Sequence, residues 1–384
     1  VNLMHPPKPG LFNPGFFICP VLAKELDSRQ TGMHARSMED GFFTELGFLQ
    51  RQRLDIEMAA LQYCKSKQDA TMKATFREAI RMRDEKTAGT ILFEGLQAFG
   101  PLYPLHLIHT CYDSVCSLYD ELSIEPAIRL DTLADIKLWT QTYADSHGLE
   151  TGLTQVFWIA RHLCARILRL GRLQFEPACL KAPFRIYRVE DSARLVTIAE
   201  ANMACDANGY RTDEEKSSFI TTLAEDGLML QAHVVDGRQG NVAAKPTLFD
   251  KAALHCIADA TTEVLHLHIP AGERLIGNAV DASLTQAKAF FPAHRVAVCT
   301  SWLLDPALSL VADTESNIVQ FMERFSKFPV PFQTPQIFER VFGFTATAED
   351  IPQWKATTTL QRSIQRALCE GVTFRTMGGY FLLE

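Results

Sequence analysis

The sequence predicts an α+β protein, in which a helical N-terminal domain precedes a domain that mixes strands with helices. Apolar residues recur every three to four positions from residue 39 to about residue 133, which is the period of a helix. Beyond residue 150, short β-branched runs and alternating polar and apolar residues interrupt the helical pattern. A chain of 384 residues is long enough for two domains. We place the boundary at His147–Gly152, which gives domains 1–150 and 151–384.

The N-terminal half begins with residues 1–20, whose prolines and glycines predict an extended arm. Apolar faces at helical spacing then predict several helices. One of them ends at Gly100–Pro101, because proline cannot continue a helix and glycine favours its end. Another runs from Leu130 to Tyr143.

The second half contains both kinds of element. Helices are expected at Thr154–Leu168, Arg211–Leu223, Ile337–Phe342 and Leu360–Cys369. Strands are expected at Gly171–Glu176, Arg185–Val189 and Leu228–Val235, the last followed by an Asp236–Gly237 turn. A closing hairpin is expected from Val372–Arg375 and Gly378–Leu383. Leu195–Ala201 fits either a strand or the start of a helix.

The clearest unit runs from Glu263 to Pro306 and predicts a strand, a loop, a helix and a second strand. Its parts are Val264–Ile269, Pro270–Arg274, Asp281–Phe291 with Asp281 as the cap, and Arg295–Leu304. The two strands of such a unit are parallel neighbours, and ligands bind beyond their carboxyl ends. His268, the loop and Cys299–Trp302 are therefore expected at one candidate site.

Composition excludes several classes of protein. A net charge of −7 does not favour nucleic acid as a partner, since phosphate binding needs a basic face. No apolar run approaches the roughly 20 residues of a membrane helix. Residues Val1–Met4 lack the basic and then apolar start of a signal peptide. Ten scattered cysteines without a CxxC pair predict reduced thiols in a cytoplasmic protein.

No metal site is expected. Cys111 and Cys116 are the closest cysteines, and no histidine cluster lies beside them at the spacing of a zinc site. His106 and His109 are three residues apart and can share a helix face. No acidic third ligand lies near them in the sequence, so packing or surface roles are expected for both.

Several phrases resemble a bacterial family of acyltransferases that pairs a helical N-terminal domain with a GNAT-like C-terminal domain. They are Leu267–Gly272, Cys299–Pro306, Asp313–Ile318, and Leu360–Arg362 with Gly379–Tyr380. The resemblance covers most of residues 150–384, and the helical half more weakly. It implies a GNAT-like mixed-sheet α/β domain and an acyl-CoA-dependent N-acyltransferase that acts on the amine of a small-molecule acceptor. The alternative is a non-catalytic GNAT-like binding or interaction protein.

The resemblance also implies where acyl-CoA binds. The mixed sheet should splay between the strands Val264–Ile269 and Val296–Leu303, and the amides at the start of the intervening helix should hold the pyrophosphate. The residues implied for acyl-CoA binding are Ile269, Gly272, Arg274 and Trp302. The family usually has Gln/Arg-x-x-Gly-x-Gly/Ala in this loop. This chain has only Gly272 and Gly277 there, with Glu273 between them.

Acyl transfer from a thioester to an amine needs a base and a proton for the leaving thiolate. Glu176 and His268 are the candidate bases, and Cys299 and Ser301 are the candidate proton donors. Each also has a purely structural interpretation as a strand or strand-end residue. A second chemical interpretation makes Cys299 a nucleophile served by His268.

Overall fold

A computed structural model describes residues 41–190, 192, 194–331, 336–343 and 346–383. It divides the chain into two compact units, Val1–Phe48 and Leu49–Glu384. The described part of the first unit contains α2 (Gly41–Glu45) and a cluster of the Phe42, Phe43 and Phe48 rings. The arm expected at residues 1–20 lies outside the described residues. Within the described residues, no helix combines the length and apolar character needed to cross a membrane.

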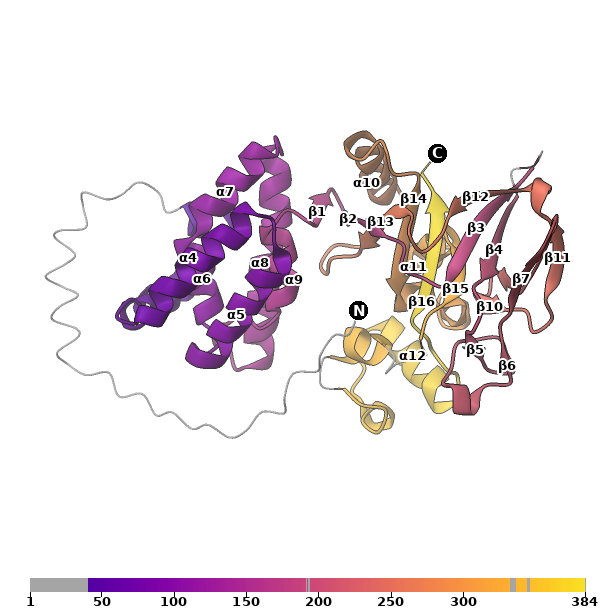
Figure 1. Cartoon of the computed structure of the whole chain (residues 1–384). Coiled ribbons are helices and arrows are strands. Elements are labelled where there is room, and N and C mark those ends of the chain that lie inside the picture. Colours follow the sequence, from indigo (N-terminus) through magenta and orange to yellow (C-terminus); the bar gives the residue numbers. More distant parts are fainter. Residues whose placement is uncertain (1–40, 191, 193, 332–335, 344–345, 384) are drawn as a thin grey trace, which may run out of the picture. The chain divides into compact units, whose positions relative to one another are not determined.

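Helices build the first part of the second unit, as the sequence predicts (Figure 1). They are α3 (Gln50–Tyr63), α4 (Lys67–Arg81), α5 (Glu85–Phe99), α6 (Tyr103–Thr110), α7 (Tyr112–Glu121), α8 (Pro126–Ser146) and α9 (Val156–Leu163). Side-chain caps begin two of them, because Ser66 accepts from the backbone of α4 and Asp84 from that of α5. α5 ends at Gly100, whose φ of +88° suits glycine. The helix expected to reach Leu168 ends at Leu163 instead.

A six-stranded mixed sheet forms the centre of the C-terminal part. Its strands, in spatial order, are β1 (Leu168–Leu170), β2 (Leu173–Cys179), β13 (Glu263–His268), β14 (Val296–Ser301), β16 (Met377–Leu382) and β15 (Ser326–Pro329). β13 and β14 are parallel and are connected through α10 (Gly277–Phe290), which confirms the predicted strand–helix–strand unit. The other pairs in this sheet are antiparallel.

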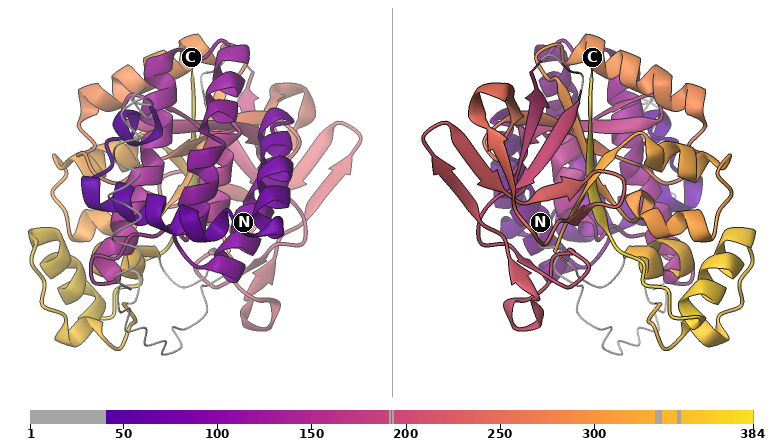
Figure 2. Two further views of the ribbon diagram at one scale, coloured as in Figure 1. Left: turned by 90° about the vertical axis from the view of Figure 1, so that its left-hand side faces the viewer. Right: turned by 90° about the vertical axis from the view of Figure 1, so that its right-hand side faces the viewer.

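Smaller antiparallel sheets accompany it. A five-stranded sheet has the order β10 (Asn241–Val242), β9 (Val234–Asp236), β4 (Leu195–Ala199), β3 (Phe184–Val189) and β12 (Leu254–Ala258). A three-stranded sheet has the order β11 (Thr247–Asp250), β8 (Met229–Ala232) and β7 (Leu223–Asp226), and a two-stranded one joins β5 (Ala204–Cys205) to β6 (Phe219–Ile220). Figure 2 shows the three-stranded sheet at the edge of this part of the chain.

Two apolar cores cover the two faces of the six-stranded sheet. On one face, Val264, Val298 and Tyr380 pack against residues of the five-stranded sheet such as Phe184 and Val235. On the other face, the sheet packs against α10 and α11 (Asn317–Glu323). Figure 1 shows β14 and β16 between these two layers.

Four expectations about elements are wrong. Arg211–Leu223 is not a helix, because Phe219 and Ile220 pair with β5. Asp281 does not cap α10, which begins after Ile276; Asp281 pairs with Arg324 instead.

The other two lie near the end of the chain. The second strand of the βαβ unit stops at Ser301, and Trp302–Leu304 form a 3-10 helix. Val372–Arg375 is not a strand, since β16 pairs with β14 and β15 rather than forming a closing hairpin. The helix expected near the C-terminus is present as α12 (Thr359–Cys369).

Candidate active site

The two central strands separate towards their carboxyl ends. The parallel register between β13 and β14 contains only two pairs, Leu265–Ala297 and His266–Val298. On their outer sides, β13 makes six pairs with β2, and β14 makes six pairs with β16. Beyond His266 and Val298 each strand therefore continues beside its outer neighbour without pairing across the centre. The splay implied by the family resemblance lies at this point.

The register gathers polar side chains on one face of β2 and β13. His266 lies opposite Glu176, and His268 lies opposite Gln174. Directly opposed residues of an antiparallel pair point to the same face of the sheet. Glu176, predicted from the sequence as a separate base, is therefore brought beside His268, which it meets at the end of β13.

Glu176 is held as a carboxylate by two partners. Arg161 on α9 donates to both carboxylate oxygens, and its Nε lies 3.1 Å from Oε1. His268 Nε2 lies 3.1 Å from Oε2. Burial opposes the charge of Glu176, but the hydrogen bonds from His268 and Arg161 outweigh it and lower the pKa of Glu176 to about 2. Glu176 is therefore ionised at neutral pH.

His268 is neutral at the same pH. Burial lowers the pKa of His268 below its ordinary value of 6.5, and the carboxylate of Glu176 offsets only part of that effect. Because an ionised carboxylate only accepts, Nε2 of His268 carries the ring proton and Nδ1 holds the free lone pair. The side chain keeps 27% of its surface exposed, so the imidazole is open to a reactant. This arrangement suits a general base.

The helices supply partners that the sequence analysis missed. The Trp158 ring packs edge-on against His268, with ring centres 5.1 Å apart, and the Arg161 guanidinium lies 5.3 Å from the centre of the same indole. Asp135 on α8 accepts from Trp158 Nε1 and from Gln174 Nε2, both at 2.9 Å. The buried Asp135 carboxylate thus fixes both the indole and the strand next to the base. Trp158 and Arg161 are three residues apart on one helix, which is the only sequence signal for this pair.

Cys299 lies on the opposite face of the sheet from His268. In the parallel register Ala297 pairs with Leu265 and Val298 with His266, so Cys299 shares the face of Leu265. It is 2% exposed in the apolar core against α10, and burial raises its pKa to about 12. The structure therefore does not bring Cys299 and His268 together as nucleophile and base.

Ser301 has the same orientation as Cys299. Its hydroxyl accepts from Leu303 N at 3.1 Å and so caps the 3-10 helix that follows β14. Thr300, between the two predicted donors, is exposed and shares the face of His266 and His268. The two predicted donors, Cys299 and Ser301, thus lie on the face opposite the one that carries His268.

The loop after β13 is held in place by the buried side chain of Arg172, which is 5% exposed. Its guanidinium donates to three loop carbonyls, those of Pro270 at 2.9 Å, Glu273 at 2.6 Å and Arg274 at 3.3 Å. Gly272, at φ +108°, takes a conformation that suits glycine. Three bonds from one buried cation give the loop a fixed shape.

The residues implied for acyl-CoA binding all lie around this loop and the end of β14. Arg274 is exposed, and so is Gly272. Ile269 and Trp302 are half-buried and pack against the core on the α10 side of the sheet. α10 begins at Gly277 without a side-chain cap, so its first amides are not occupied by a capping side chain.

Comparison of the sequence with protein families finds two matches. Residues 167–381 match a family model described as the GNAT-like C-terminal domain. Residues 44–165 match one described as the N-acyltransferase N-terminal domain. No curated protein sequence matches the chain significantly.

Solved structures with the same fold include an acyltransferase in complex with decanoyl-CoA and teicoplanin. It has a TM-score of 0.58 and 19% sequence identity, with 89% of this chain and 87% of that chain covered. A mutant acyltransferase in complex with octanoyl-CoA has a TM-score of 0.58 and 18% identity, with the same coverage. At these identities the likeness concerns the fold, and it confirms the predicted helical domain followed by a GNAT-like mixed-sheet domain.

Proposed function

The chain belongs to the family of proteins with a GNAT-like C-terminal domain, and we propose from this premise that it transfers an acyl group from acyl-CoA to an amine acceptor. The observation that carries the proposal is the Glu176–His268 pair at the splayed end of β13. A neutral imidazole held by a carboxylate is a base at neutral pH. The match of residues 44–165 to an N-acyltransferase domain supports an amine as acceptor.

In the proposed reaction His268 takes the proton of the attacking amine at Nδ1. The amine nitrogen then forms a bond to the thioester carbon, and the carbon–sulfur bond breaks. The sulfur leaves as the thiolate of CoA and takes up the proton from the imidazolium of His268, which returns the base to its neutral form. Glu176 holds the imidazolium formed in this step, because a nearby negative charge stabilises it. Arg161 and Trp158 position the pair rather than transfer protons.

Acyl-CoA is proposed to lie in the splay between β13 and β14. The loop fixed by Arg172, together with the uncapped start of α10, offers backbone amides to the pyrophosphate. Arg274 supplies a positive charge, and Gly272 lets the backbone come close. Ile269 and Trp302 contribute apolar surface to the acyl chain. The related structures named above hold decanoyl-CoA and octanoyl-CoA, which supports a medium-chain donor here.

Three broader expectations become part of this proposal. Residues 1–150 and 151–384 act as separate domains, with the first covering the acceptor side. The acceptor is a small molecule, as teicoplanin is in one related complex. All the cysteines in the described part of the chain are free thiols, which supports a reducing, cytoplasmic location.

One observation favours a second candidate, a non-catalytic binding protein. The loop of Gly272 carries an exposed Glu273 and lacks the usual glycine spacing, which weakens its fit to pyrophosphate. Such a protein would use the same fold to hold an acyl group or a peptide without turnover.

The deciding experiment measures thermal unfolding with CoA, acetyl-CoA, octanoyl-CoA and decanoyl-CoA. A ligand at about 100 times its dissociation constant stabilises the folded state by about 2.7 kcal/mol, which raises the unfolding temperature visibly. We expect a shift that grows with acyl length, and release of the CoA thiol when an amine acceptor is added. A shift without thiol release from any acceptor would favour the binding protein. No shift with any donor would overturn both the transferase and the CoA site.

Arg172→Lys tests the loop. A lysine cannot donate to three carbonyls at once, so the KM for acyl-CoA should rise several-fold while kcat stays close to the wild-type value. Arg169→Lys is the matched control, because the Arg169 guanidinium donates to the Gly171 carbonyl rather than to a carbonyl of the loop. Equal changes of KM in the two variants would contradict the proposal that this loop binds acyl-CoA.

A further inference from the structure

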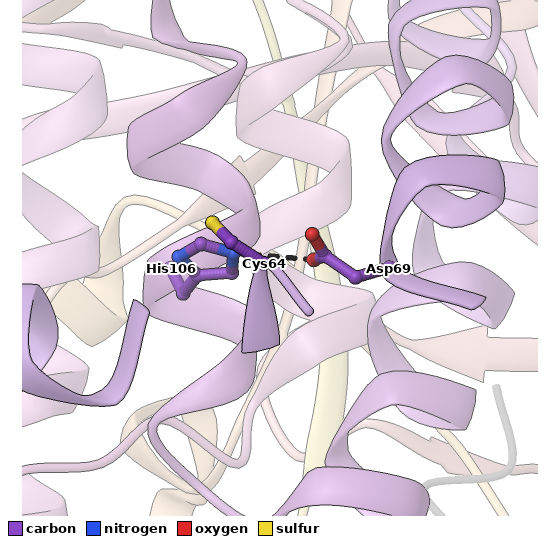
Figure 3. A group of neighbouring side chains, drawn as sticks. All are labelled: Cys64, Asp69 and His106. Carbon is purple, nitrogen blue, oxygen red and sulfur yellow. Dashed lines mark hydrogen bonds and ion pairs between the residues drawn. The ribbon is translucent and has the colours of Figure 1, made fainter. Parts of the chain in front are cut away.

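A second group of chemically active side chains lies in the helical half. Cys64, Asp69 and His106 each present one metal-ligating atom, and these atoms all lie within 4.8 Å of one another (Figure 3). They come from α3, α4 and α6, and none of these helices contributes a residue to the Glu176–His268 site. The acyl-transfer proposal does not use this cluster.

The fold places the three residues without any special loop. Cys64 is the C-cap of α3, and Asp69 lies in the first turn of α4, so the short Cys64–Ser66 connection brings the two together. His106 lies on α6 and is completely buried. The sequence separation of 37 between Asp69 and His106 explains why no acidic neighbour of His106 was visible in the sequence.

The Asp69 carboxylate is fixed before any ligand binds. It is 2% exposed. Its Oδ1 accepts from the Tyr103 hydroxyl at 3.0 Å and lies 3.2 Å from His106 Nε2. The bond from Tyr103 is of the kind that orients a metal ligand and strengthens its binding, whereas the contact to His106 Nε2 is replaced when an ion binds.

A cation already belongs to this cluster. The Lys73 ammonium lies 2.7 Å from Asp69 Oδ2 and 3.7 Å from Cys64 Sγ. Its side chain is 15% exposed, so it lies at the rim on a flexible stem. The Asp69 carboxylate and the Cys64 thiol thus flank a point that a positive charge already occupies.

We propose that Cys64, Asp69 and His106 bind a Zn²⁺ ion, which takes the place of the Lys73 ammonium. A thiolate, an imidazole and a carboxylate are the ligands that zinc prefers, and three protein ligands leave a fourth position for water. Cys64 is exposed, which gives the ion a path from solvent. His106 Nε2 is the ring nitrogen that faces the Asp69 carboxylate, so it is the atom that would bind the ion.

Proton balance follows from the ligand chemistry. On binding, the Cys64 thiol releases its proton to solvent, and the Lys73 ammonium moves out into solvent. His106 gives the Nε2 lone pair to the ion, and its ring proton moves to Nδ1. The ion then joins the α3–α4 connection to α6 and stabilises the helical half, because it binds only the folded arrangement.

Cobalt is the first probe. The full-length protein, stripped of metal with a chelator, is titrated with Co²⁺ and followed by absorption. We expect one bound equivalent with a thiolate-to-cobalt charge-transfer band and the intense visible bands of tetrahedral coordination. Zn²⁺ should displace the cobalt and abolish both, and it should also raise the unfolding temperature. No charge-transfer band in the wild type would overturn the proposal.

Three variants make the assignment specific. Cys64→Ser should remove the charge-transfer band and weaken metal binding by about tenfold or more. Cys369→Ser is the matched control, since Cys369 is also exposed and free, and should change neither. Lys73→Met removes the competing ammonium and should tighten binding. A band that survives Cys64→Ser, or is lost in Cys369→Ser, would overturn the site.

These measurements do not involve acyl transfer. An absence of metal binding would therefore leave the proposed acyl transfer untouched. An absence of acyl transfer would likewise leave the metal site untouched.

Discussion

The two faces of the β13–β14 pair differ sharply although the same strands build both. On one face His268 contacts the ionised carboxylate of Glu176, which Arg161 also binds, and an indole from α9. On the other face Cys299 lies among leucines, alanines and the apolar side of α10. Both residues were predicted from the sequence as site residues. Their environments differ because alternate residues of a strand point to opposite faces of the sheet.

The difference shows that position along a strand does not by itself make a side chain reactive. Burial acts against charge on both faces, since it lowers the pKa of His268 and raises that of Cys299. Only His268 has a charged partner that offsets burial. A partly exposed imidazole with a carboxylate can exchange protons at neutral pH, whereas a buried thiol with a pKa of about 12 remains protonated.

The largest expected effect is on turnover. His268→Ala should lower kcat/KM by roughly 10²–10⁴, because the reaction loses its base. Cys299→Ala should keep kcat/KM close to wild type at a temperature where both variants are folded. Steady-state kinetics of CoA thiol release, with thermal unfolding as the check on folding, measures both. A comparable loss of kcat/KM in Cys299→Ala would contradict this difference between the two faces and would give the Cys299 thiol a role in the reaction.

A smaller effect concerns pH. Glu176 supports the protonated form of His268, so removing its charge lowers the pKa of His268 further. In Glu176→Gln the acidic limb of kcat/KM should therefore move to lower pH, because His268 stays neutral over a wider range. The plateau should fall by about tenfold, since the imidazole becomes a weaker base and loses its orientation.

The pH profile of kcat/KM for wild type and Glu176→Gln tests this. An acidic limb that stays in place or moves to higher pH would mean that another group titrates in the reaction.

The smallest effect concerns stability. Cys299→Ser introduces a hydroxyl into the apolar core on the α10 side and should lower the free energy of unfolding by about 1–3 kcal/mol. Cys256→Ser, at an exposed position on β12, should change it by less than about 0.5 kcal/mol. Urea unfolding measures both. Equal stability of the two variants would contradict the buried, apolar environment assigned to Cys299.

Local patterns allowed much of the fold to be predicted. The run Val264–Ile269 and the helical spacing up to Phe291 predicted a parallel strand–helix–strand unit, because both depend on periodicity over neighbouring residues. The helix predicted at Arg211–Leu223 was wrong, because Phe219 and Ile220 pair with β5. This pairing is a tertiary contact that overrides the local pattern. The cap predicted at Asp281 was wrong because α10 already begins at Gly277; Asp281 lies inside the helix and pairs with Arg324, 43 residues away.

The candidate site was predicted only in part, for the same physical reason. Glu176 and His268 were chosen separately, and nothing in the sequence indicated the register that pairs β2 with β13. The bonds that complete the site join residues far apart, such as Gln174 to Asp135 over 39 positions and Arg172 to Pro270 over 98. Such contacts appear only after the chain folds.

The short register between β13 and β14 also has a mechanical consequence. Each strand is fastened along its outer edge by six pairs, whereas the seam between them is closed by only two, at Leu265–Ala297 and His266–Val298. The sheet can therefore open further along this seam while each strand keeps the ladder to its outer neighbour. Amide hydrogen exchange should be slow on the outer edges of the two strands and fast along the open seam. A bound molecule of variable length would then fit at the open end of β13 and β14 without breaking either outer ladder.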